Sequence, residues 1–374
     1  MDEPNNSKYY LITATRPADP PGRDPRRVDA GATTRYTSTP DGQWTGRGLA
    51  RSARSILGGF LLAVGSCRRP ATVAGQKPGA SAASAGYKLQ WDRPTAMDFR
   101  RLVVVTTVAT AVTALLGVLT ATAGAGLTCE ARWPLCDGAV FGLFPATFMS
   151  AIEWVHRLVA MVTGLLVVGT TAAAWRGGRS RRVRLATLAA LLFTPVQVAF
   201  GAFTVLVREF VFGYSILVLT LHFALASAIL GLLVAASVWA DAAETPVTPD
   251  RVRLAGLAAL LALPILMVLT PRLLVTFGNP VQLVYYAAGF GAFAALTAGA
   301  LWARELDATR VAAAAGLAAA VVVIQLVAAR RAFGDAGQLV VLALTVAAFA
   351  LAAWAVRRSR TVEPSFARAE SVGD

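Results

Sequence analysis

MDFRRLVVVTTVATAVTALLGVLTATAGAG, residues 97–126, opens with two arginines and then runs on in Val, Ala, Leu, Thr and Gly without another charge. A helix needs about 20 consecutive apolar residues to cross the ~30 Å hydrocarbon core of a bilayer. The apolar run at 102–126 is long enough for that. We therefore expect it to form a membrane-spanning helix, with Arg100 and Arg101 at its inner flank.

Seven further runs of this kind follow along the chain, and hydrophobic residues make up 56% of the protein against 15% charged residues. The runs lie at 151–175, 185–207, 213–240, 254–274, 281–303, 311–329 and 338–356. The sequence therefore predicts an all-α integral membrane protein with eight transmembrane helices in the lipid bilayer. The net charge of +14 does not indicate nucleic-acid binding, because the basic residues fall between apolar runs instead of forming one face.

The arginines that flank the runs are unevenly divided between the two sides. With the amino terminus inside, the inner flanks collect Arg100, Arg101, Arg176, Arg179, Arg181, Arg182, Arg184, Arg251, Arg253, Arg304, Arg310, Arg357, Arg358 and Arg360. The outer flanks collect Arg132, Arg208, Arg272, Arg330 and Arg331. The positive-inside rule then predicts a multi-pass protein of the cell membrane with both termini cytoplasmic.

Residues 1–96 differ from the rest in composition, being rich in Pro, Gly, Ser and Arg and lacking sustained periodicity. We expect them to be a disordered extension. Two interpretations of this leader compete: a signal sequence at RSARSILGGFLLAVGSC (51–67), or a non-functional extension from a mis-set start, which the short, glycine-interrupted core favours.

The eight predicted helices divide into two halves, 97–245 and 246–360, followed by a cytoplasmic tail at 361–374. TPVQVAF (194–200) is echoed by VVIQLVA (322–328) at the same place in each half. Four spans per half make the halves run in the same direction, related by an axis along the membrane normal. The echo of Gln197 at Gln325 predicts structural bonds between helices.

The first outward loop, LTCEARWPLCDG (127–138), contains Cys129 and Cys136. An oxidising exterior lets a disulfide persist, and Trp133-Pro134 favours a turn that brings the ends of the loop together. The sequence favours a disulfide over the alternative of two unpaired cysteines.

The only two histidines, His156 and His222, both fall inside predicted spans, at similar depths in the outer half of the bilayer. An ionisable side chain within a membrane is costly and points to function. Two imidazoles from facing helices suit the axial positions of a haem iron. Small residues surround them: Ala160, Thr163, Gly164, Ala226 and Ser227. The alternative is that these small residues pack helices and that each histidine bonds to a neighbouring helix.

Glu153 lies three residues before His156, so both share one helix face. One interpretation gives Glu153 a proton-transfer role beside the metal, and the other gives it an ion pair with Arg157. Arg157 is also suited to a haem propionate, because a guanidinium fork matches a carboxylate.

From about Met97 onward the chain resembles the haem A synthases of cytochrome oxidase assembly. The resemblance rests on CEARWPLCDG, IEWVHRLVAMVTG (152–164), VQVAFGAFTVLV (196–207) and LTLHFALA (219–226), in that order. It implies two four-helix halves and the oxidation of a methyl group of haem O to the formyl group of haem A. By the same resemblance, His156 and His222 hold the haem, Glu153 is catalytic, and Cys129 pairs with Cys136.

The carboxy-terminal half departs from that family, which has a second histidine pair holding a haem b. Tyr285 or Tyr286 stands at the third position and Thr345 or a neighbour at the fourth. This argues against a second haem, so electrons would come from a partner, a neighbouring protomer of a homo-oligomer, or the one site. The implied partners are haem O synthase and cytochrome oxidase assembly factors. The alternative function is a non-enzymatic haem-binding assembly or transfer protein.

Overall fold

The structure, a computed structural model, describes residues 98–129, 135–136, 144–206, 216–270, 275, 278–329 and 334–360. The chain divides into two units, Met1–Lys88 and Leu89–Asp374, and every described residue belongs to the second. The leader 1–96, the Trp133-Pro134 turn, the tail 361–374 and the outer-flank arginines Arg132, Arg208, Arg272, Arg330 and Arg331 lie outside the described residues.

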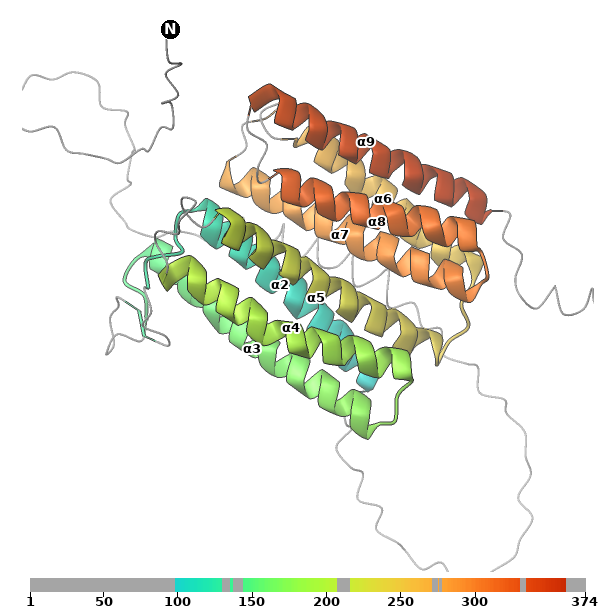
Figure 1. Ribbon diagram of the computed structural model, residues 1–374, viewed down its shortest axis with the longest axis horizontal. Helices are drawn as coiled ribbons and strands as arrows, with labels where there is room; N and C mark the ends of the chain where they lie inside the picture. Colours follow the sequence, from blue (N-terminus) through green and yellow to red (C-terminus); the bar gives the residue numbers. More distant parts are fainter. Residues whose placement is uncertain are drawn as a thin grey trace, which may run out of the picture. The chain divides into compact units, whose positions relative to one another are not determined.

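The described part is entirely helical apart from its connections (Figure 1). In chain order the helices are α2 (Phe99–Thr122), α3 (Phe148–Arg176), α4 (Arg181–Leu206), α5 (Ile216–Ala242), α6 (Pro249–Val268), α7 (Asn279–Glu305), α8 (Thr309–Ala329) and α9 (Gly334–Ser359). By length and composition, eight helices of this part are able to cross a membrane. The prediction of an all-α protein with eight spans is confirmed.

Helix α3 begins three residues before the apolar run that predicted it, because Thr147 caps its first turn. The Thr147 hydroxyl accepts a hydrogen bond from the Ser150 amide at 3.1 Å, which satisfies a backbone donor that the helix itself leaves open. At its other end α3 stops at Gly177 and Gly178, and Gly178 has a φ of +59° that favours glycine. His156 is therefore eight residues after the first residue of α3, three more than the apolar run implied.

The helices pack as two rings of four. In the first ring the neighbours are α2 with α3, α3 with α4, α4 with α5 and α5 with α2, so α3 and α5 occupy opposite corners. The second ring closes in the same way through α6, α7, α8 and α9, which puts α7 and α9 at opposite corners. Successive helices alternate in direction, and Figure 1 shows α6–α9 repeating the directions of α2–α5.

The two rings meet along unequal faces, α2 and α5 from the first ring against α7 and α8 from the second. An exact two-fold axis would bring the same face of each ring to the contact. Aromatic rings fill this interface: Phe223 of α5 stacks on Phe290 at 5.6 Å between centroids and meets the edge of Tyr286 at 5.5 Å. Such pairs add about 0.5–1.5 kcal/mol each beyond the area they bury.

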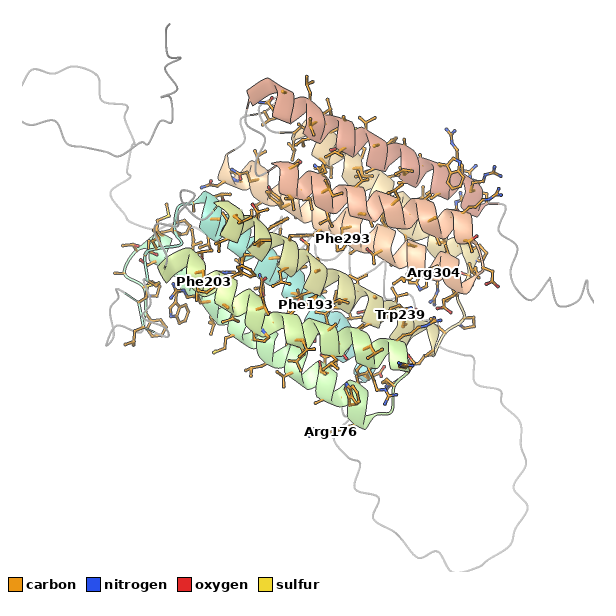
Figure 2. The ribbon with its side chains drawn as sticks, in the orientation of Figure 1. Arg176, Phe193, Phe203, Trp239, Phe293 and Arg304 are labelled. Carbon is orange, nitrogen blue, oxygen red and sulfur yellow. A yellow bond between two sulfur atoms is a disulfide. The ribbon has the colours of Figure 1, made fainter. Side chains whose placement is uncertain are left out.

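Because the helices alternate in direction, all fourteen arginines of the predicted inner flanks gather at one end of the described bundle, which we call the arginine-rich end. Figure 2 shows Arg176 and Arg304 at this end and Phe203 near the opposite one. The opposite end carries Cys129 and Cys136, and we call it the loop end.

Asp241, near the last residue of α5, joins the two rings at the arginine-rich end. Its carboxylate pairs with Arg100 from the start of α2 and, at 2.5 Å, with Arg251 from the start of α6. Arg251 also donates to the Thr245 hydroxyl at 3.2 Å. The Asp241 side chain is only 13% exposed, so water replaces these partners poorly.

We predict that Asp241→Ala lowers stability by about 1–3 kcal/mol, because two guanidinium groups lose a shared and largely buried acceptor. The measurement is the thermal unfolding midpoint of the purified protein in detergent. Glu305→Ala is the control: it removes a 2.8 Å pair with Arg182 whose side chains are 35% and 67% exposed, which costs less than about 1 kcal/mol. Equal shifts for the two variants would contradict the prediction.

Candidate functional site

The two histidines lie on helices at opposite corners of the first ring. His156 is eight residues after the first residue of α3, and His222 is six residues after the first residue of α5. At ~1.5 Å per residue these positions are about 12 and 9 Å along their helices from the loop end. Both histidines therefore lie toward the same end of one four-helix ring. The structure thus brings together the pair that the sequence singled out.

His156 lies against helix α2. A Cβ atom on Gly117 would stand 3.1 Å from Cε1 of the imidazole and 3.5 Å from Nε2. The ring also interacts with the main chain of Thr113, one turn earlier on α2. Its Nδ1 is buried and has no hydrogen-bond partner among the described residues. A buried ring nitrogen in that state has capacity for a ligand.

His222 lies against helix α4. Its Nε2 is 3.2 Å from Nε2 of Gln197, and a Cβ atom on Gly201 would stand 3.3 Å from its Cε1. The donor and acceptor roles in this contact depend on the tautomer of the His222 ring. Oε1 of Gln197 is buried and finds no hydrogen-bond partner in the described part of the chain. The predicted bond between helices is confirmed for Gln197, and it falls on a candidate ligand.

The Glu153 carboxylate, 2% exposed, is held by donors from two directions. Oε1 pairs with Arg157, one turn further along α3. Oε2 accepts the Cys129 amide at 2.8 Å and the Thr128 hydroxyl at 2.9 Å. The ion pair expected as one interpretation is therefore present, and the same carboxylate anchors the start of the cysteine loop to α3. The catalytic interpretation stays a prediction.

The disulfide between Cys129 and Cys136 is present, with a Cα–Cα distance of 4.6 Å, which confirms the predicted pair. Both cysteines are buried. The aromatic rings of Phe144 and of Trp154 on α3 are 5.9 Å apart between centroids. Through Glu153 the disulfide segment is tied to the helix that carries His156.

The corresponding region of the second ring is filled with side chains. Tyr285 and Tyr286 of α7 are 0% and 1% exposed, and their rings meet edge to face at 5.3 Å. The amide nitrogen of Gln325 donates to the Tyr285 hydroxyl, so the predicted link between helices is confirmed here as well. Thr345 is buried and turns its hydroxyl to its own helix, donating to the Val341 carbonyl at 2.8 Å. These residues do not fit a haem, since they offer no imidazole pair and leave no space between them.

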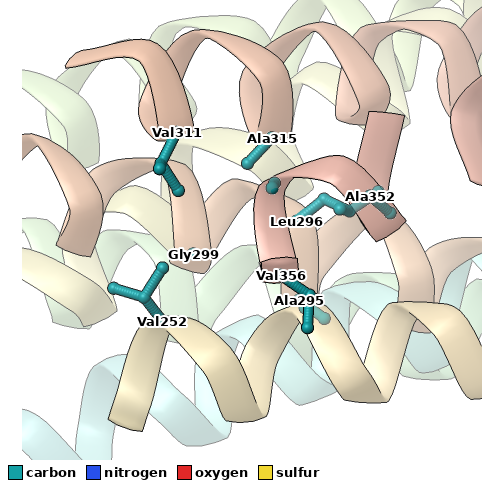
Figure 3. A pocket seen from close by; sticks show the side chains of 10 residues that line it. Val252, Ala295, Leu296, Gly299, Val311, Ala315, Ala352 and Val356 are labelled. Carbon is teal, nitrogen blue, oxygen red and sulfur yellow. The ribbon is translucent and has the colours of Figure 1, made fainter. Parts of the chain in front are cut away.

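A small cavity of about 10 Å³ lies at the arginine-rich side of the second ring (Figure 3). Its lining is apolar throughout: Val252, Gly256, Ala295, Leu296, Gly299, Val311, Ala315, Ala352, Ala355 and Val356. Small-molecule sites usually measure ~300–1,000 Å³ and contain a few polar groups. This pocket offers no atom that would ligate iron.

Sequence reasoning missed two residues that shape the site, Gly117 and Gly201. Both belong to stretches that the sequence analysis quotes for other reasons, the apolar stretch 97–126 and VQVAFGAFTVLV (196–207). The signal that could have found them is a glycine in the middle of a membrane span, where glycine marks a close approach of neighbouring helices. No group of three or more His, Cys, Asp or Glu in the described residues is arranged to hold a metal ion.

Comparison with known families matches residues 100–369 to the model of the COX15-CtaA family, described as cytochrome oxidase assembly protein. The chain belongs to this family of multi-pass membrane proteins. No solved structure shows significant similarity to the chain.

Relatives of two names match parts of the chain. A protoheme IX farnesyltransferase of Halobacterium salinarum is 46% identical over 90 residues, 24% of this chain and 20% of that protein. The heme A synthase of Bacillus licheniformis is 35% identical over 122 residues, 32% of this chain and 38% of that protein. The heme A synthase of Bacillus pumilus is 34% identical over 127 residues, 33% of this chain and 39% of that protein. The chain thus matches no more than about two fifths of the length of these relatives.

We predict that Glu153→Ala releases the cysteine loop and makes its disulfide at least about tenfold easier to reduce. Hydrogen bonds to a charged group contribute about 1.5–3 kcal/mol each, and about 1.4 kcal/mol corresponds to a factor of ten. The measurement is the rate of thiol labelling of Cys129 and Cys136 in isolated membranes after a pulse of dithiothreitol. Thr128→Ala, which removes one of the donors, should give a smaller increase. A wild-type rate in Glu153→Ala would show that the loop is held by other contacts.

Proposed function

We propose that this protein is a haem A synthase, a membrane oxidoreductase that converts a methyl group of haem O to the formyl group of haem A for cytochrome oxidase assembly. The observation that carries the proposal is the pair of histidines: they stand on helices at opposite corners of one four-helix ring, at similar distances from the loop end. Membership of the cytochrome oxidase assembly family and the partial similarity to named heme A synthases support it.

The residues of the first ring fit a haem. Neutral imidazole is the usual axial ligand of iron in a haem protein, and two of them give the six-coordinate form. His156 has a buried nitrogen without a hydrogen-bond partner in the described part, and both imidazoles keep part of their surface accessible. Tyr285 and Tyr286 in the second ring are by contrast completely enclosed. His156 and His222 would hold the iron, and the bound haem would supply both the redox centre and the methyl group that reacts.

Two further residues of α3 complete the proposed site. We assign Glu153 the transfer of protons at the loop end, because a buried carboxylate at the edge of the apolar slab is placed to accept them. Arg157 would bind a haem propionate. Its guanidinium carries five N–H donors, so it is able to serve a propionate and the Glu153 carboxylate together.

The distribution of charge supports an orientation with the arginine-rich end in the cytoplasm and the loop end outside the cell membrane. In that orientation both termini are cytoplasmic, and the disulfide faces the oxidising side. We propose the enzyme that supplies haem O as a partner of this protein. Cytochrome oxidase assembly factors would take the product.

We also propose that the chain binds one haem, with none in the second ring. The Tyr285, Tyr286 and Gln325 side chains occupy the interior there, each at most 1% exposed. Electrons would then reach the first ring from another protein, from a second protomer, or through the single site.

The same filled ring favours a second candidate function, a non-enzymatic haem-binding protein of assembly or transfer. Such a protein would keep the histidine pair and dispense with a route for electrons through the second ring. The two candidates differ in the haem that they hold after encountering haem O.

We predict that co-expression with a haem O source gives a purified protein whose extracted pigment contains haem A or its hydroxylated precursor. Chromatography of the extract makes the measurement. Haem B or haem O alone would support the carrier, and a protein without pigment would contradict both candidates. His156→Ala and His222→Ala should each lose most of the haem, and Glu153→Gln should keep haem O but form little haem A.

We predict one haem per chain. The measurement is the ratio of haem, from the pyridine haemochrome spectrum, to protein, from amino-acid analysis. Tyr285→Phe removes the acceptor of the Gln325 amide and should leave this ratio unchanged, whereas His222→Ala should reduce it several-fold. A ratio of two in the wild-type protein would overturn the proposal that the second ring lacks a haem.

A further inference from the structure

Each candidate ligand histidine rests on a glycine of the adjacent helix. His156 of α3 lies over Gly117 of α2, where an added Cβ would come within 3.1 Å of Cε1, 3.5 Å of Nε2 and 3.8 Å of Nδ1. His222 of α5 lies over Gly201 of α4, where an added Cβ would come within 3.3 Å of Cε1 and 4.0 Å of Nδ1. Carbon atoms in favourable contact stand about 3.5–4.0 Å apart. Neither position therefore has room for a methyl group unless the imidazole moves.

The two contacts are built alike. On α2, Thr113 stands four residues before Gly117 and interacts with His156 through its main chain. On α4, Gln197 stands four residues before Gly201 and binds His222 through its side chain. Residues four apart share one face of a helix. In both cases one face of the neighbouring helix offers a polar contact to the histidine. One turn further on, the same face has a glycine, and the imidazole lies where a larger residue would have its side chain.

The absence of a side chain at each glycine fixes the distance between the imidazole and the neighbouring helix. Helices α3 and α5 are at opposite corners of the four-helix ring. The imidazole of His156 is therefore held by α2, and the imidazole of His222 is held by α4 from a different side. A shift of a few tenths of an ångström at either glycine would change the separation of the two imidazoles. Iron–nitrogen bonds tolerate little change of that kind, since metal–ligand distances vary by only about 0.2 Å.

We propose that Gly117 and Gly201 are positioning residues that set the placement of the two axial imidazoles. The proposal rests on the proposed function, because it takes His156 and His222 to be the haem ligands. Gly117 has the larger influence, since three atoms of the His156 ring are within 4 Å of its would-be Cβ and only two atoms of His222 are near that of Gly201.

The test compares Gly117→Ala and Gly201→Ala with Gly169→Ala and Gly291→Ala. An added Cβ at either control position, one on α3 and one on α7, meets nothing within 4 Å. All four changes place alanine in a helix and gain a similar helix propensity, so this contribution cancels from the comparison. The readouts are the low-spin fraction of the bound haem, by electron paramagnetic resonance and optical absorption, the haem retained per chain, and the unfolding midpoint of the haem-free protein.

We expect Gly117→Ala to convert part of the haem to the high-spin form and to weaken haem retention on the order of tenfold, as loss of ligand-orienting contacts commonly does. Gly201→Ala should act in the same direction to a smaller extent. The two controls should match the wild-type protein, and the haem-free unfolding midpoints of all four variants should agree. If Gly117→Ala fails to fold, Gly201→Ala decides alone, and a wild-type spectrum for it overturns the proposal.

Failure of this proposal is distinguishable from failure of the proposed function. If His156→Ala and His222→Ala keep a wild-type haem spectrum, the histidines are not ligands and the proposed function falls. If the histidine variants lose the spectrum while Gly117→Ala and Gly201→Ala behave like the controls, only the positioning role is overturned.

Discussion

An imidazole inside an apolar helix must find its polar contacts on another helix, because hydrocarbon offers none. That constraint organises the first ring of this protein. His156 interacts with the main chain of α2 and His222 with a side chain of α4. Neither contact forms unless the neighbouring backbone comes close, and a glycine at each point of contact allows it. The polar contact to each histidine and the glycine beside it therefore depend on each other.

The second ring meets the same constraint in another way. Gln325 occupies the place on α8 that Gln197 occupies on α4, yet its amide binds the Tyr285 hydroxyl of α7 instead of an imidazole. The larger tyrosine rings, with Leu326 pressed against Gly289, fill the space between the helices. A glutamine that links two helices is common to both rings, and the residue that it meets differs: an imidazole in the first ring and a tyrosine in the second.

Much of this organisation could be predicted from the sequence, because the membrane imposes simple rules. The length of the apolar runs gave the eight helices, and the cysteine spacing together with the Trp-Pro turn indicated the disulfide. The histidine pair stood out because ionisable residues are rare in spans. Which helix faces which was not predictable, since the runs are apolar on every side and carry no periodicity. The glycine contacts and the unequal faces between the rings depend on that packing, so they emerged only from the structure.

Glu153 illustrates why a residue's role resists prediction even when the residue itself is found. The sequence offered a proton carrier or an ion pair with Arg157, and the structure adds donors from Thr128 and the Cys129 main chain. A carboxylate that accepts hydrogen bonds from α3 and from the start of the cysteine loop suits an anchor for that loop. The contacts that hold the loop therefore converge on the residue that the sequence singled out for proton transfer, so a chemical role for Glu153 would be exercised from the position that also anchors the disulfide segment.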